Sequence, residues 1–484
     1  MKLGWVDLSV IVLYLVGITA FGAQFRRGQH TLKDYFLGGR TIPWWAIALS
    51  IVSAETSILT IIGTPGIAFG GNLGFLQVVF GYLLARVVIS TILLPHYFKG
   101  ELYTAYQLID RRFGPRLKRV TAGAFLVIRS LAEGVRVFAI SILVTIVLGT
   151  GELTSVVLIT ILTLFYTFEG GMTAVIWTDV IQMFIYVAGA LLSLYMLWQS
   201  APGGWEQVAA LAAASGNKLA VFDFRFDFTY PYTLWGGILG GMFLCTATHG
   251  TDQLMVQRLL AARNESDSRK ALFGSWVVIL FQFTLFLIIG IFLFAYYHAN
   301  PPSQPFSRTD AIFPTYIVEQ FPPVVAGLVV AAILAAAMSN LSAALNSLAS
   351  TTIVDFYKPW MGAKRDEKHY LLASRLATLF WGAVMIGIAL VVAKGKTSVF
   401  ELGLSLASVA YGSLLGTFLL GVLTTRANQN GSILGMLAGL GVMIYVSTST
   451  KIAWTWYVLI GTTVTFTVGY LASLMSNEPR DSGT

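Results

Sequence analysis

Residues 44–66 read WWAIALSIVSAETSILTIIGTPG, an apolar stretch interrupted by a carboxyl group, several hydroxyls, two glycines and a proline. A helix needs about 20 mostly apolar residues to cross a bilayer, and this stretch is long enough. Glu55 nevertheless brings a carboxylate to membrane depth, and Gly63 and Pro65 weaken the second half of the helix. A broken helix is tolerated in a membrane only where it lines a cavity or packs against protein. The stretch therefore predicts an internal cavity in a membrane protein.

The composition of the chain supports this class. Of the 484 residues, 56% are hydrophobic and only 11% are charged, whereas soluble proteins carry roughly 25% charged residues. The single cysteine, Cys245, excludes an internal disulfide framework and a cysteine-based metal cluster. The net charge of +8 could indicate a nucleic-acid partner, so the positions of the cations decide its meaning.

The hydropathy pattern predicts an all-α membrane protein with about thirteen spans. Their expected ranges are 5–24, 43–70, 74–95, 119–148, 153–168, 172–199, 233–257, 272–298, 324–354, 371–393, 399–422, 431–449 and 453–475. An amphipathic stretch at 310–322 is expected to form a short external helix. The longest outside linker, 200–232, is interpreted as a connector or an external lid.

Lysine and arginine are concentrated in every second linker between the predicted spans. Twenty of the 31 lie in one set of linkers and seven in the other, and the four within spans are Arg86, Arg129, Arg136 and Arg375. The positive-inside rule then places the N-terminus outside and the C-terminus in the cytoplasm. The net positive charge therefore reflects the membrane topology and does not indicate a nucleic-acid partner. The expected location is the plasma membrane (the inner membrane in a bacterium), and the expected partner is the lipid bilayer. We expect Arg86 and Arg375 to extend from the spans to the membrane interface.

A second interrupted span follows five spans after the first. Gly236, Gly237, Gly240 and Gly241 precede a polar run that ends at Asp252. Two such spans are typical of inverted-repeat transporters, with spans 2–6 and 7–11 as the two halves. Close helix packing is the alternative explanation of the glycines, but it does not explain Glu55. The predicted organisation is a leading helix (1–30), a transport core (31–425) and two trailing helices with a short tail (426–484).

Oxygen-bearing side chains share one face of span nine. Ser339, Ser342, Asn346 and Ser350 recur at intervals of three and four residues. Such a face can bind a hard monovalent cation, although serine hydroxyls in helices also bond to the preceding turn.

Other charges at or near membrane depth leave alternatives open. Asp179 can serve an ion or a proton, or be reached by water near the end of its span. One helix face carries Arg129, Glu133 and Arg136. Either an arginine of this set faces an anion, or the three side chains form an ion triad that compensates its own charges and stabilises the helix. His249 can bind substrate or protons, or be a hydrogen-bonded structural residue.

Several ordered motifs resemble those of the sodium:solute symporter family. They read DYFLGGR at 34–40, YTFEGGMTAVIWTD at 166–179, GTDQLMVQR at 250–258, MSNLSAALNS at 338–347 and DFY at 355–357. The resemblance implies a LeuT-type 5+5 inverted repeat with thirteen or fourteen helices, of which the second and seventh are broken.

The resemblance also implies a sodium site between spans two and nine. Its ligands would be the carbonyls of Ser53, Thr56 and Ala336 and the side-chain oxygens of Ser339 and Asn340. Asn340 departs from the usual serine or threonine, but its amide oxygen is still a hard ligand.

A second cation site, present in some sialic acid symporters, would use Asp179, Ser339 and Ser342 with one more hydroxyl. Here that last position is Ala343, which supplies no oxygen. The resemblance therefore leaves one or two sodium ions per cycle open.

The expected function is sodium-coupled import of a small polar or anionic organic solute, such as a sugar, a sialic acid-like compound, a carboxylate or an amino acid. A proton-coupled transporter on the same fold is the main alternative, and a membrane sensor is a further one. An enzyme is not expected, because no nucleophile elbow or metal-ligand cluster is visible in the sequence. The substrate-binding candidates are Glu55, Thr56, Ser57, Gln77, Arg129, Arg136 and His249.

Overall fold

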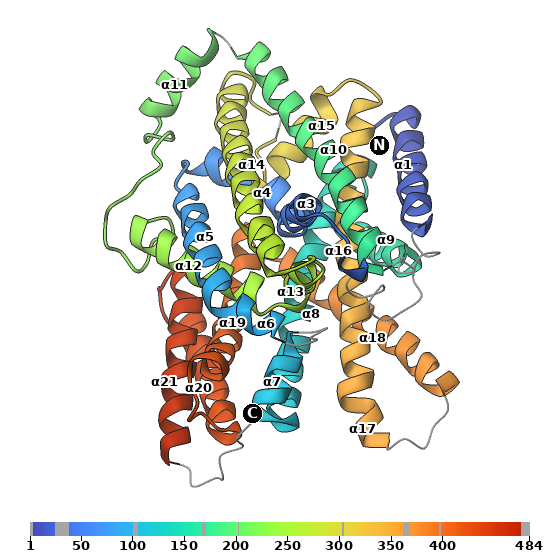
Figure 1. Ribbon diagram of the computed structural model, residues 1–484. Coiled ribbons are helices and arrows are strands. Elements are labelled where there is room, and N and C mark those ends of the chain that lie inside the picture. Colours follow the sequence, from blue (N-terminus) through green and yellow to red (C-terminus); the bar gives the residue numbers. More distant parts are fainter. Residues whose placement is uncertain are drawn as a thin grey trace.

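The computed structural model describes residues 3–24, 38–99, 105–166, 171–201, 203–302, 304–361, 367–395 and 398–475. Within these ranges the protein is all-helical and has no β-strand, only an isolated bridge between Ile42 and Ala262 (Figure 1). The predicted all-α class is confirmed.

Each of the thirteen predicted spans coincides with a helix or with consecutive helices. The first half of the chain forms α1 (Trp5–Gln24), α3 (Trp44–Glu55), α4 (Ile58–Gly70), α5 (Leu76–Val88), α6 (Leu94–Phe98), α7 (Tyr106–Phe113), α8 (Pro115–Leu148), α9 (Glu152–Tyr166), α10 (Gly171–Ser200) and α11 (Gly204–Ala214). The second half forms α12 (Leu234–Gly250), α13 (Gln253–Leu260), α14 (Glu265–Ala299), α15 (Ile312–Gln320), α16 (Val325–Thr351), α17 (Lys358–Met361), α18 (Glu367–Ala393), α19 (Val399–Leu423), α20 (Gln429–Ser449) and α21 (Tyr457–Met475).

The helix α15 lies where a short external helix was expected, whereas α11 lies in a linker for which no helix was predicted. Nine of the described helices are long and apolar enough to cross a membrane, and the bent pair α3 and α4 makes ten. The figure of thirteen crossings therefore stays a prediction.

The second span is broken at Thr56 and Ser57, where α3 and α4 are bent by 65°. Gly63 and Pro65 lie inside α4 and do not make the break. Gly63 instead permits close packing, since a Cβ there would lie 2.4 Å from the Cβ of Phe400 on α19. The break therefore falls at the hydroxyl-bearing residues.

The seventh span is broken as well, between α12 and α13 at Thr251 and Asp252. Asp252 begins α13 by accepting a hydrogen bond from the N–H of Leu254 at 2.9 Å. The glycines from 236 to 241 are helical. Gly237 and Gly241 pack against α5, where a Cβ on Gly241 would lie 2.2 Å from the carbonyl oxygen of Val78, whereas Gly236 and Gly240 pack against Thr455. Close packing thus accounts for these glycines. The break lies beyond them, at the polar residues Thr251 and Asp252.

The half-helices α3 and α13 contact each other near the middle of the molecule (Figure 1). The trailing helices α20 and α21 pack against α19 at one side of the structure.

The leading helix caps the start of α16. Asp7 accepts hydrogen bonds from the N–H groups of Val324 at 2.7 Å and Gly327 at 3.1 Å. A Cβ on Gly327 would lie 2.7 Å from the carbonyl oxygen of Asp7, so glycine is needed for this approach. The helix expected to bind sodium is thereby fixed at one end.

The packing of α5 on α12 yields a test. Substitution Gly241→Leu is expected to abolish folding, because the side chain would overlap the α5 backbone. Size-exclusion chromatography and thermal unfolding of the purified protein measure the effect. Gly441→Leu on α20 is the matched control, because no atom lies within 4 Å of a Cβ there. Equal elution and melting of the two variants would contradict this packing.

Candidate functional site

The first break releases two backbone carbonyls from the helical hydrogen-bond ladder. In a continuous helix, the N–H of Ser57 would donate to Ser53 and that of Thr60 to Thr56. Here Ser57 donates to the carbonyl of Glu55 and Thr60 to that of Ser57, both at 2.9 Å. Ser53 and Thr56 are both buried. Their freed carbonyls are two of the predicted sodium ligands.

Further unpaired polar atoms lie around this break. Gln282 on α14 donates to the hydroxyl of Thr56 at 2.7 Å. Tyr186 on α10 lies beside Ser53 and Thr56. Within the described residues, the Tyr186 hydroxyl and both polar atoms of the Gln182 side chain are buried without a hydrogen-bond partner. Sequence reasoning missed Gln182 and Tyr186, although they follow Asp179 by three and seven residues and so share its helix face.

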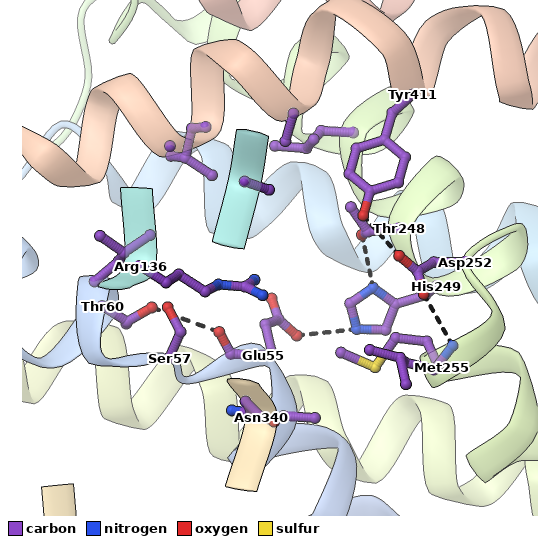
Figure 2. A pocket seen from close by; sticks show the side chains of 18 of the residues that line it. Glu55, Ser57, Thr60, Arg136, Thr248, His249, Asp252, Met255, Asn340 and Tyr411 are labelled. Carbon is purple, nitrogen blue, oxygen red and sulfur yellow. Dashed lines mark hydrogen bonds and ion pairs between the residues drawn. The ribbon is translucent and has the colours of Figure 1, made fainter. Parts of the chain in front are cut away.

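The helix α16 contacts α4, the second half of the broken span. Asn340 lines a cavity that Glu55 and Ser57 also line (Figure 2). Ala336 and Ser339 belong to the same helix, but their side chains, like those of Ala343, Asn346 and Ser350, lie outside the described residues.

The cavity has a volume of about 160 Å³, so it suits a small solute. The side chains drawn in Figure 2 come from several helices that surround it. Five substrate-binding candidates line it, namely Glu55, Ser57, Arg129, Arg136 and His249. Asp252 and Tyr411 also line it and were not among the candidates.

Glu55 is the centre of a buried charge cluster. Arg86 on α5 and His249 on α12 approach the same carboxylate oxygen, at 3.2 and 3.1 Å. Arg86 is fully buried and also donates to the sulfur of Cys245 at 2.6 Å. The expectation that Arg86 extends to the membrane interface is therefore wrong, because it compensates an internal carboxylate. His249 is both hydrogen-bonded and part of the cavity wall.

The arginines of α8 do pair with their own glutamate. Glu133 contacts Arg136, and it lies 3.1 Å from Arg129. Arg129 also lies 3.6 Å from Asp252, which accepts a hydrogen bond from the Tyr411 hydroxyl at 2.7 Å. The side chain of Arg136 is 26% exposed against 8% for Arg129, so Arg136 is the more accessible cation. The triad is thus self-paired, and Arg136 also faces the cavity.

Asp179 is buried and paired inside the protein. Arg258 on α13 lies 3.0 Å from one of its oxygens, and Ser50 on α3 donates to the same oxygen at 2.7 Å. Arg258 also donates to the Ser50 hydroxyl at 3.0 Å. Of the two alternatives for Asp179, access by water is therefore wrong, because the carboxylate and its arginine are both buried. The arginine instead joins the broken helices α3 and α13 to α10.

Gln77 is not placed in the cavity. Its side-chain amide donates to the carbonyls of Gly74 at 3.2 Å and Tyr232 at 2.8 Å. Its oxygen accepts from the N–H of Asp223 at 3.1 Å. Gln77 therefore holds the linker before α12 and is corrected from a substrate candidate to a structural residue.

Comparisons with known proteins show the family and the relatives of this chain. The model of the sodium:solute symporter family matches residues 35–439. The sodium/sialic acid symporter NanT of Aliivibrio fischeri is 28% identical over 483 residues, which cover 99% of this chain and 95% of that protein. The human sodium-coupled monocarboxylate transporter 1 is 28% identical, over 92% of this chain and 74% of that protein.

Solved structures show the same fold. A Na⁺-coupled sialic acid symporter in a substrate-bound, outward-open state superposes with a TM-score of 0.82 at 26% identity, over 98% of both chains. A nucleobase-cation-symport-1 family transporter gives a TM-score of 0.58 at 10% identity and covers 94% of this chain and 98% of that one. The LeuT-type fold implied by the resemblance is confirmed.

The Glu55 cluster can be tested by a double-mutant cycle. Glu55→Gln leaves the buried guanidinium of Arg86 uncompensated, which is expected to cost about 3–5 kcal/mol of unfolding free energy. Adding Arg86→Met is expected to restore part of this loss, as measured by denaturation in mixed micelles. The exposed pair Asp267 and Lys270 is the control, and Asp267→Asn is expected to cost under about 1 kcal/mol. No coupling between positions 55 and 86 would contradict the pairing.

Proposed function

The chain belongs to the sodium:solute symporter family, and on this premise we propose that one sodium ion, bound between the α3–α4 break and α16, drives uptake of a small anionic organic solute. The protein is a multi-pass membrane transporter and not an enzyme, and sodium is its coupling ion.

The release of the Ser53 and Thr56 carbonyls is the observation that supports the sodium site best. Together with the carbonyl of Ala336 and the side-chain oxygens of Ser339 and Asn340, they would give five oxygens. Oxygen ligands suit a hard cation such as sodium. The ion would replace the hydrogen bonds that the broken helix lacks.

Coupling follows from the position of the ion beside the cavity. Sodium would fix the segment that carries Glu55 and Ser57, both of which line the cavity. Ion and solute affinities are then linked reciprocally. One charge crossing ~100 mV releases about 2.3 kcal/mol, and a tenfold sodium gradient adds about 1.4 kcal/mol. One ion is therefore enough to concentrate a neutral solute several-hundredfold. A monoanionic solute cancels the charge of the ion, so only the sodium gradient acts on it, and its accumulation is about tenfold.

We propose one sodium and not two because the second candidate site already contains a cation. Asp179 is neutralised by Arg258, and both are buried. Ala343 supplies no hydroxyl to complete the set with Ser339 and Ser342. The guanidinium thus takes the place of a mobile second ion.

The solute is proposed to carry a carboxylate that binds Arg136. This guanidinium faces the cavity, and the one carboxylate that pairs with it among the described residues, Glu133, is shared with Arg129. The relatives named above transport sialic acid and monocarboxylates, which are both carboxylates. The carboxylate of Glu55 and the hydroxyl of Ser57 would accept hydrogen bonds from the hydroxyl or amide groups of such a solute.

No described feature favours proton coupling, since Glu55 and Asp179 are each paired with an arginine. We further propose that the N-terminus lies outside and the C-terminus in the cytoplasm of the plasma membrane, on the charge asymmetry of the linkers. Transport is assigned to residues 31–425, flanked by the leading and trailing helices.

The sodium site is tested by Ser339→Ala. Loss of one ligand oxygen is expected to abolish sodium-dependent uptake in proteoliposomes while the protein still folds. Uptake equal to that of the parent would refute the site.

Ser342→Ala is the matched control for Ser339→Ala, on the same face of α16. With one bound ion it is expected to retain uptake with a Hill coefficient of one for sodium. Equal loss in both variants would favour two ions.

The solute assignment is tested by Arg136→Gln. Removing a charge-assisted hydrogen bond typically costs about 1.5–3 kcal/mol, so affinity for a carboxylate is expected to fall at least about tenfold. Thermal stabilisation by a sialic acid, lactate, glucose and proline measures binding across solute classes. Arg136→Lys, which keeps the charge, is expected to retain part of the affinity. The assignment fails if glucose binds best, or if Arg136→Gln leaves carboxylate binding unchanged.

A further inference from the structure

The linker between α11 and α12 contains a regular alternation that the transport site does not use. Phenylalanines occupy positions 222, 224, 226 and 228, and Asp223, Arg225, Asp227 and Thr229 lie between them. A period of two places the two sets on opposite sides of an extended chain. The four rings are 45–70% exposed, which is unusual for so apolar a set. We call residues 222–229 the aromatic strap.

The rings of the strap continue the surface of the spans. Phe222 stacks on Phe80 of α5, with ring centroids 5.9 Å apart. Phe226 and Phe228 contact Trp456, just before α21, at 6.3 and 4.8 Å. Phe226 also contacts Trp235 of α12, which is 46% exposed.

Backbone hydrogen bonds place the strap where three helices begin. The N–H of Asp223 donates to Gln77, the second residue of α5, and its carbonyl accepts from Leu234, the first residue of α12, at 2.7 Å. The carbonyl of Phe228 accepts from Ala453, shortly before α21, at 2.7 Å. Figure 1 shows this linker running along the edge of the molecule beside α5. The ends of apolar spans mark the membrane boundary, so the strap lies at that level.

The opposite side of the strap is suited to water. Arg225 hydrogen-bonds Asp223 and thereby lowers the pKa of its carboxyl group. Asp227 accepts bonds from the N–H and hydroxyl of Thr229 at 2.7 Å, which lower the pKa of its carboxyl group. Both carboxylates therefore stay charged at neutral pH.

We propose that the aromatic strap is an interfacial anchor whose four phenylalanines insert among the lipid headgroups of the leaflet at which α5, α12 and α21 begin. Tryptophan and tyrosine are enriched at this level of a bilayer, and segments that lie in the interface also bury phenylalanine there. The occupant is a phospholipid surface, because the rings are continuous with the exposed side of the spans, whereas the charged groups alternate with them along the extended chain.

The strap is also connected to the transport cavity. Tyr232, three residues beyond it, donates to Glu401 of α19 at 2.5 Å, and its ring contacts Phe75. Phe75 packs on Phe283 and Phe400, which line the cavity. The anchor therefore fixes one wall of the cavity relative to the membrane surface.

Site-directed fluorescence tests the anchor in the full chain. Phe224→Cys, Phe226→Cys, Arg225→Cys and Asp227→Cys are each labelled with a polarity-sensitive dye and reconstituted in phosphatidylcholine–phosphatidylglycerol vesicles. The parent, whose one cysteine is buried, is the unlabelled control. Dyes at 224 and 226 are expected to show blue-shifted emission and at least twofold stronger quenching by nitroxide lipids than dyes at 225 and 227.

The alternative occupant is a second copy of the chain. Nanodiscs that hold one protein each distinguish insertion into lipid from contact with such a copy. The blue shift at 224 and 226 is expected to persist there. Equal quenching at all four positions, no quenching at any, or loss of the shift in single-copy nanodiscs would overturn the anchor. Elution at the parental position confirms that each labelled variant is folded.

Discussion

A backbone carbonyl within the hydrocarbon layer must be paired, and this constraint governs both helix breaks. At the second break the protein supplies partners itself: Tyr97 donates to the carbonyl of Gly250 at 2.5 Å, and Asp252 caps the next half-helix. At the first break the carbonyls of Ser53 and Thr56 lose their helical donors. In the site that we propose, a sodium ion would satisfy both oxygens, and this would make the broken helix responsive to sodium.

The buried charges around the site are compensated between helices. Glu55 is paired with Arg86, and Asp179 with Arg258. Breaking such a pair leaves an uncompensated buried charge, so these pairs hold α3, α5, α10 and α13 in register. Because both carboxylates are paired with arginines, we propose that mobile sodium binds to the neutral oxygens of the α3–α4 break. The cation that we propose for binding the solute is Arg136, the more accessible arginine of α8.

The sequence allowed the spans and the broken helices to be predicted, because hydropathy and polar residues at membrane depth are local features. The partners of the charges could not be predicted in this way. Arg86 was assigned to the interface and Gln77 to the substrate, yet Arg86 meets Cys245, 159 residues away, and Gln77 meets Tyr232, 155 residues away. Such pairings follow from the packing of α5 on α12. The glycines of α12 make this close packing possible, but their pattern in the sequence does not indicate which helix packs there. The site residues of the first break were recognisable, since Glu55, Thr56 and Ser57 interrupt an otherwise apolar run.

Hydrogen exchange at the first break tests the central claim most directly. Amide exchange of residues 53–61 and 336–342 is compared in sodium and in potassium at equal ionic strength, by mass spectrometry of the purified protein in nanodiscs. If sodium joins α3 and α4 to α16, both segments exchange more slowly in sodium than in potassium, and Ser339→Ala removes the difference. Identical exchange of both segments in the two salts would contradict the account.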